Sequence, residues 1–150
     1  MAGIGEIVDN MVKEIPGVMA AIFIDKDGIP LATAGELKFD SYDLGAIGAV
    51  CLESCQILGG DLGQFWIENV IIEFDDMKVI QCPTAVGAML ILAEKSADID
   101  VIRKEAKNKI ESLSYAKEAM EWCKGKFMPS PAPQGDSEFL KLISLFKEVE

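Results

Sequence analysis

The sequence predicts an α+β domain in which helices cover both faces of a five-stranded antiparallel sheet. Its apolar residues follow helical or strand spacing in the order helix, two strands, helix, three strands, helix. The strands are short and tightly connected, which pairs neighbours in the chain antiparallel. Two of them are apolar throughout, a pattern typical of strands covered on both faces. Such a sheet needs helices above and below it.

The chain opens with a helix and a hairpin. Residues 4–15 place their apolar side chains on one stripe, and a Pro-Gly pair ends this helix. Residues 18–24 are continuously apolar and predict a strand buried on both faces. A turn at residues 25–28 leads into the second arm, residues 30–34. That arm begins with proline, which donates no backbone hydrogen bond and therefore suits an edge of the sheet.

The middle helix begins at Asp40 or Ser41 and runs to about Gly60. Apolar residues cover most of its circumference, so we expect burial on more than one side. The expected core stripe is Leu44, Ile47, Cys51, Cys55, Leu58 and Leu62. Small residues elsewhere on the helix leave its backbone open to close approach. One side is expected to pack on the sheet, and the rest to be available to another chain.

The second half of the domain is a three-strand meander and a long helix. Residues 65–74 predict a long strand, followed by strands at 77–82 and 87–93, the last of them central in the sheet. The final helix is expected from about residue 98 to residue 124, with Ser96 or Asp98 as its cap.

A Pro-rich stretch and a short amphipathic segment follow the predicted domain. We expect a domain at residues 1–126, a linker at 127–136 and a C-terminal helix at 137–150. No apolar run reaches the about 18 residues of a membrane span, and the N-terminus carries acids where a signal peptide carries bases. The expected location is the cytoplasm.

Charge and rare residues exclude several classes of function. The net charge of −11 argues against nucleic-acid binding and against anionic membranes. The chain has no histidine, which removes the commonest general base and metal ligand, and its one arginine is Arg103. The four cysteines contain no CxxC pair and are expected to be small buried apolar residues, with no metal site and no cofactor. Acid pairs lie at turns and a helix start, so no enzyme is predicted.

Four short motifs resemble the roadblock domain family, the dynein light-chain and GTPase-regulator type. The sequence EIPGV at residues 14–18, followed by DKDGIPLA at 25–32, is similar to the opening of these domains. Residues 79–93 resemble their last hairpin, and DIDVIR at 98–103 resembles the start of their final helix. The order and spacing of the motifs carry the resemblance, which extends from about residue 4 to residue 120.

The resemblance implies a fold and a function. It implies one helix, the middle one, on one face of the sheet and two helices on the other. Roadblock domains dimerise by pairing their third strands and middle helices into one continuous sheet. They act as scaffolds or regulators for small Ras-like GTPases and have no catalytic residues of their own. Some members bind dynein intermediate chains.

The residues favour a homodimer independently. The predicted strand at 65–74 is an apolar edge without lysine, which invites aggregation unless it pairs with its own copy. We therefore expect a dimer interface made of Phe65, Ile67, Asn69, Val70, Ile71, Ile72, Gly45, Gly48, Ala49 and Leu52. The outward positions of the middle helix are expected to bind the partner, a small Ras-like GTPase, or else to be buried against the sister subunit: Tyr42, Ala46, Val50, Glu53 and Ile57.

Two alternatives and two details remain at this stage. The alternative function is a small-molecule sensor of profilin-like or PAS-like shape, with Trp66 and Trp122 marking a pocket. Arg103 is expected to pair with Asp100 rather than to serve as an arginine finger. The C-terminal helix is expected to dock within the dimer, and the alternative is a regulatory plug over the partner surface.

Overall fold

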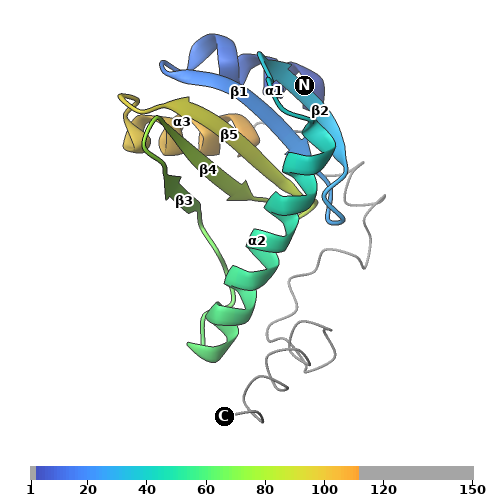
Figure 1. Cartoon of the computed structure of the whole chain (residues 1–150). Helices are drawn as coiled ribbons and strands as arrows, with labels where there is room; N and C mark the ends of the chain where they lie inside the picture. Colours follow the sequence, from blue (N-terminus) through green and yellow to red (C-terminus); the bar gives the residue numbers. More distant parts are fainter. Residues whose placement is uncertain (1–2, 112–150) are drawn as a thin grey trace.

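The structure is a computed structural model that describes residues 3–111 (Figure 1). The elements follow the predicted order. They are α1 (Ile4–Glu14), β1 (Val18–Ile24), β2 (Pro30–Gly35), α2 (Ser41–Asp61), β3 (Val70–Glu73), β4 (Met77–Pro83), β5 (Ala88–Glu94) and α3 (Ile99–Glu111). The rest of the predicted final helix, the linker and the C-terminal helix lie outside the described residues.

The five strands form one antiparallel sheet in the order β2-β1-β5-β4-β3. The two fully apolar strands, β1 and β5, lie next to each other near its centre, as the sequence predicts. Pro30 lies on the edge strand β2. At the other edge is β3, which pairs with β4 alone. The fold class predicted from the sequence is confirmed.

The larger core lies between the sheet and the pair α1 and α3. Side chains of Met11 and Ile102 from the two helices meet Phe23 and Ile91 from the central strands, all fully buried. Lys109 of α3 forms an ion pair with Glu14 of α1, which joins the two helices. These two helices therefore cover one face, and α2 covers the other (Figure 1).

The smaller core lies under α2, where the helix approaches the sheet very closely. A Cβ atom on Gly48 would lie 2.8 Å from the Cδ2 atom of Leu90 on β5, and one on Gly45 would overlap the carbonyl oxygen of Gly28. We predicted that these glycines permit a close crossing with a second copy, and this was wrong. Their open side faces the sheet of their own chain, where the absence of a side chain lets α2 pack.

Side-chain caps start two of the helices. The carboxylate of Asp40 accepts a hydrogen bond from the backbone N–H of Tyr42, and that of Asp98 accepts two from the first turn of α3. Arg103 forms an ion pair with Asp100 at 3.0 Å, as expected. Of the two residues predicted to cap each helix, Asp40 caps α2 and Asp98 caps α3.

The third strand is much shorter than predicted. Residues 65–74 were expected to be strand, yet β3 covers only Val70–Glu73. The first paired residue, Val70, lies opposite Gln81, and β4 ends two residues later at Pro83. Proline donates no ladder hydrogen bond and the chain then turns, so residues 65–67 would lie beyond the end of β4 without a partner. Phe65, Ile67 and Asn69 accordingly lie in the connection before the strand.

Candidate protein interface

The outer edge of β3 has no strand beside it within residues 3–111. Strand β3 contains no lysine or proline, the residues that commonly protect an edge from pairing. On the face that α2 covers, Val70, Ile72 and Val79 are only half-buried. These side chains place apolar surface at the open edge, next to the buried polar side chain of Gln81 on the same face. Ile71 and Phe74 are exposed on or beside the strand.

One side of α2 is apolar and open. Its members recur at spacings of three and four, which places them along one line of a helix. Ile47, Leu58 and Leu62 are 67%, 60% and 67% exposed, and the other three members are half-buried. We call this set the seam strip: Leu44, Ile47, Cys51, Cys55, Leu58 and Leu62.

The seam strip was predicted to be the core stripe. Leu44 does pack against the smaller core, but the exposures of Ile47, Leu58 and Leu62 show that the prediction was wrong for most of the strip. Helical periodicity finds an apolar side but does not say what covers it. The side of α2 next to the seam strip is the one that packs on the sheet. On that side Gly45 and Gly48 are buried, and Ala49 and Leu52 pack against the smaller core. The four α2 residues predicted for the dimer interface therefore contact their own sheet. The two glycines were the signal that marked the sheet-facing side.

The predicted partner-binding residues divide into two groups. Four of them are exposed on the outer side of α2, and we call them the docking face: Tyr42, Ala46, Val50 and Glu53. Ile57 is only 6% exposed, so its prediction as an outward contact residue was wrong.

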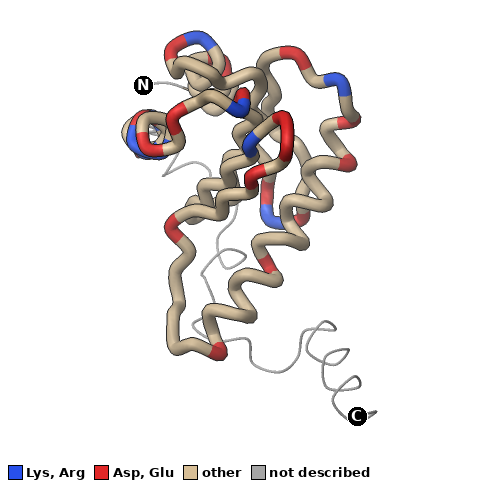
Figure 2. Tube along the Cα trace, turned by 60° about the vertical axis from the view of Figure 1, so that its left-hand side comes forward, with Lys and Arg blue, Asp and Glu red and all other residues tan. Residues whose placement is uncertain are grey.

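The charge on α2 is entirely acidic. The helix contains Asp43, Glu53 and Asp61 and neither lysine nor arginine, as the tube in Figure 2 shows. A long uncharged stretch separates these acids along the helix. The docking face therefore offers apolar contact with a weak negative field, which suits a partner with basic groups around an apolar centre.

The cysteines of the described residues have two different environments. Burial raises the pKa of the Cys82 thiol to about 12. Cys55 is more open; partial burial raises its pKa, and the neighbouring Cys51 thiol, which lies within hydrogen-bonding reach, raises it further. Within residues 3–111, no three or more His, Cys, Asp or Glu side chains gather in a way that could hold a metal ion.

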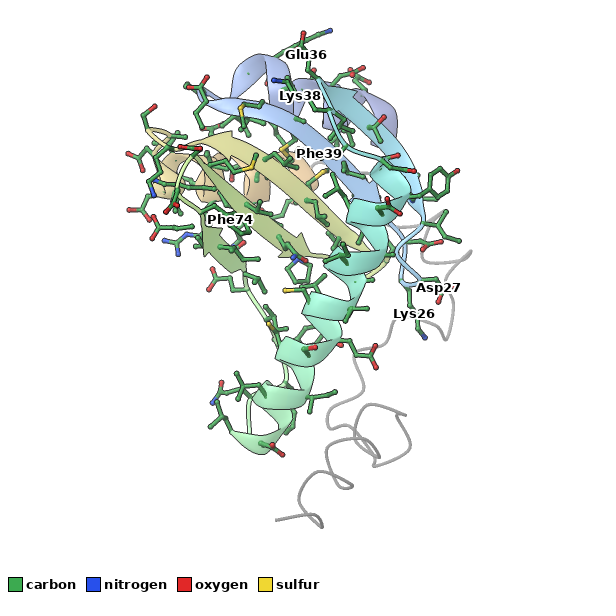
Figure 3. All side chains as sticks on the ribbon, in the orientation of Figure 1. Lys26, Asp27, Glu36, Lys38, Phe39 and Phe74 are labelled. Atoms are coloured by element: carbon green, nitrogen blue, oxygen red, sulfur yellow. The ribbon has the colours of Figure 1, made fainter. Side chains whose placement is uncertain are left out.

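A groove of about 690 Å³ runs along α2 on the side of the docking face, opposite the seam strip. Lys26 and Asp27 of the β1–β2 turn line it beside the helix (Figure 3). Val50 of α2 and Phe65 and Trp66 of the connection before β3 also contribute.

A search of the described residues finds no helix long and apolar enough to cross a membrane.

Comparison with known proteins identifies the fold. No protein-family model matches the chain. Two uncharacterised proteins of Methanocaldococcus jannaschii, MJ0310 and MJ0714, are 20% and 21% identical to it over 113 residues. These alignments cover 71% of this chain, and 99% and 96% of the two relatives.

Three solved structures share the architecture. MglB of Myxococcus xanthus superposes with a TM-score of 0.71 at 15% identity and covers 80% of this chain and 95% of its own. The gliding protein MglB of Thermus thermophilus gives 0.66 at 19% identity, with 81% and 95% covered. A Roadblock/LC7 domain from Streptomyces avermitilis gives 0.65 at 18% identity, with 80% and 99% covered. The described domain thus has the roadblock fold that its sequence motifs predict.

Proposed function

We propose that this chain forms a homodimer through the β3 edge and the seam strip, and that the dimer is a non-catalytic scaffold or regulator which binds a small Ras-like GTPase on its docking face. The observation that carries the proposal is the exposed apolar side of α2, together with the half-buried Val79 and Ile72 on the same face of the sheet and an unpaired strand edge. A surface of this kind marks a site of protein association.

A two-fold axis that is perpendicular to the sheet and lies beside β3 would cover both the open strand edge and the seam strip. It pairs β3 with its copy antiparallel and joins the two sheets. The same axis places the second α2 on the same face, antiparallel to the first. Helix α2 contacts β2, β1, β5 and β4, so it crosses the sheet toward the open edge. The two seam strips then bury each other, while the docking faces stay outside.

The partner class rests on the fold and on charge. Roadblock domains resembling this sequence serve small Ras-like GTPases, and two of the similar structures are MglB proteins. Another MglB structure has a tetrameric arrangement. In this chain, the paired α2 helices provide two docking faces next to each other. Arg103 is bound to Asp100, so we expect any effect on GTP hydrolysis to come from the partner's own switch segments.

The dimer is tested by a charged substitution in the seam strip. Leu58→Glu places a carboxylate where two apolar strips meet and should weaken dimerisation about 10²-fold or more, because each dimer loses two buried leucines. The matched control is Glu53→Lys, a charge change on the exposed outer side of the same helix. Sedimentation equilibrium measures both. A wild-type chain that stays monomeric at high concentration would overturn the proposal.

The partner is tested by capture from the source organism with immobilised full chain. Extracts are supplied with GTP or with GDP, and bound small GTPases are identified by mass spectrometry. Substitution of Val50 by glutamate should abolish capture and leave the dimer intact, since Val50 is 59% exposed outside the seam strip. Capture that survives this substitution would place the partner elsewhere on the molecule.

A second candidate function is a small-molecule sensor, favoured by the groove of about 690 Å³ beside α2. Trp66 lines this groove, whereas Trp122 lies outside the described residues. A ligand that binds only the folded state raises the melting temperature by mass action. A thermal-shift screen with nucleotides and metabolites therefore tests the sensor, and no shift with any compound would eliminate it.

A further inference from the structure

Two cysteines lie together in the middle of the seam strip. Cys51 and Cys55 are separated by one helical turn, and their thiols are within hydrogen-bonding reach of each other. Both are half-buried, and neither belongs to the two cores of the domain. The pair is therefore a thiol cluster on a side of α2 that faces neither core and is only partly covered by the described residues of its own chain.

The position of the pair within the strip is symmetric. The seam strip runs from Leu44 to Leu62, and its midpoint is position 53, which is also the midpoint between Cys51 and Cys55. When two such strips pack antiparallel about their centre, each residue before the midpoint faces one equally far beyond it. Cys51 of each copy then faces Cys55 of the other. With the two-fold axis of the proposed dimer at this midpoint, four thiols meet there, two from each chain.

We propose that this four-thiol cluster binds one thiophilic divalent cation, Zn²⁺, between the two copies of the chain. The inference rests on the homodimer of the proposed function, because one copy supplies only two ligands. Zinc takes four thiolates in a tetrahedron with Zn–S distances of about 2.3 Å. Binding forms four Zn–S bonds and releases the four thiol protons to solvent.

The remaining chemistry of the described residues agrees with a site of this composition. The chain has no histidine, so the cysteine thiolates are the strongest zinc ligands that it offers. Cys82 cannot contribute, because it is buried in the larger core on the opposite face of the sheet. Two thiols one turn apart on a helix are already adjacent, so pairing the helices completes the ligand set without rearranging the backbone.

The site is tested on the reduced full chain. The protein is stripped with a chelator, loaded with Zn²⁺ and desalted, and its metal is measured by elemental analysis. We expect one zinc per two chains. Replacement of zinc by Co²⁺ should give the intense absorption bands of tetrahedral thiolate coordination. Cys51→Ser and Cys55→Ser should each lose the bound metal, whereas Ser54→Ala, between them on the same helix, should keep it.

The outcomes separate this inference from the proposed function. A dimer by light scattering that holds no zinc overturns the metal site and leaves the dimer standing. A monomer overturns both. Zinc bound at one per chain, or retained by both serine variants, places the metal elsewhere and also overturns the inference.

Discussion

At the scale of single residues, two glycines decide how α2 lies on its sheet. Almost every side of this helix is apolar, so hydrophobicity alone gives several orientations of similar burial. Only the side with Gly45 and Gly48 lets the helix backbone reach Gly28 and Leu90. The choice turns the seam strip toward the open part of the sheet. Two missing side chains therefore determine which surface is left for another molecule.

We expect Gly45→Ala to destabilise the domain by about 1–3 kcal/mol, because its Cβ would overlap the rigid backbone at Gly28. Gly48→Ala should cost less, since the atom in its way is the end of the flexible Leu90 side chain. Urea denaturation at one fixed chain concentration measures both. Gly5→Ala in α1 is the control: nothing lies within 4 Å of its Cβ, so it should be neutral or stabilising. Equal losses for Gly45 and Gly48 would contradict this packing.

Thiol reactivity should separate the described cysteines. The thiolate is the reactive form, and the pKa of Cys82 is raised to about 12, above the ordinary value of 9.0. Because the folded state holds this proton more tightly, its contribution to stability is complete below pH 9 and is lost as the pH rises toward 12. At pH 8, an alkylating reagent should therefore modify Cys51 and Cys55 but not Cys82 in the folded, metal-free Leu58→Glu variant, whose seam strips are apart. Peptide mass spectrometry identifies the labelled sites, and labelling of all three in urea is the control.

At the scale of elements, the sequence predicts well which helices and strands exist and in what order. It predicts poorly how far a strand extends and which side of a helix is exposed. Periodicity and turns predict all eight helices and strands of the described domain, because each of those signals is local. The extent of β3 was overestimated because its only partner, β4, runs just two residues beyond the last pair, Val70 and Gln81, and ends at Pro83. The core side of α2 was mistaken for the same reason. Both properties depend on residues distant in the chain.

Hydrogen exchange of the two edge strands tests the dimer at this scale. In the proposed dimer β3 is paired on both sides, whereas β2 remains an edge. The outward-facing amides of β3 should therefore exchange more slowly than those of β2 at high protein concentration. In Leu58→Glu, the protection of β3 should fall while that of β2 stays the same. Similar exchange rates in both strands of the wild-type protein would show that the β3 edge is open.

At the scale of the whole molecule, charge acts against the assembly that the apolar surfaces favour. Each chain carries a net charge of −11, so a dimer brings two strongly acidic bodies together. The proposed dimer interface itself is almost uncharged. The seam strip contains no charged residue, and the β3 edge contains only Glu73, at its end. The free energy of apolar burial must therefore exceed the electrostatic repulsion between the two copies. Salt reduces this repulsion, because the Debye length falls to about 10 Å at an ionic strength of 0.1 M.

Salt should consequently affect the two proposed interfaces in opposite directions. We expect dimerisation to strengthen several-fold between about 20 and 300 mM NaCl, since screening weakens the repulsion between like-charged copies. Partner binding should weaken over the same range, because the acidic α2 attracts basic groups on the partner. Sedimentation equilibrium measures the first, and surface plasmon resonance with the captured GTPase measures the second. Glu53→Lys should reduce the salt dependence of partner binding and leave that of the dimer almost unchanged. A dimer that dissociates as salt is added would instead be held by ion pairs, which the apolar seam strip does not provide.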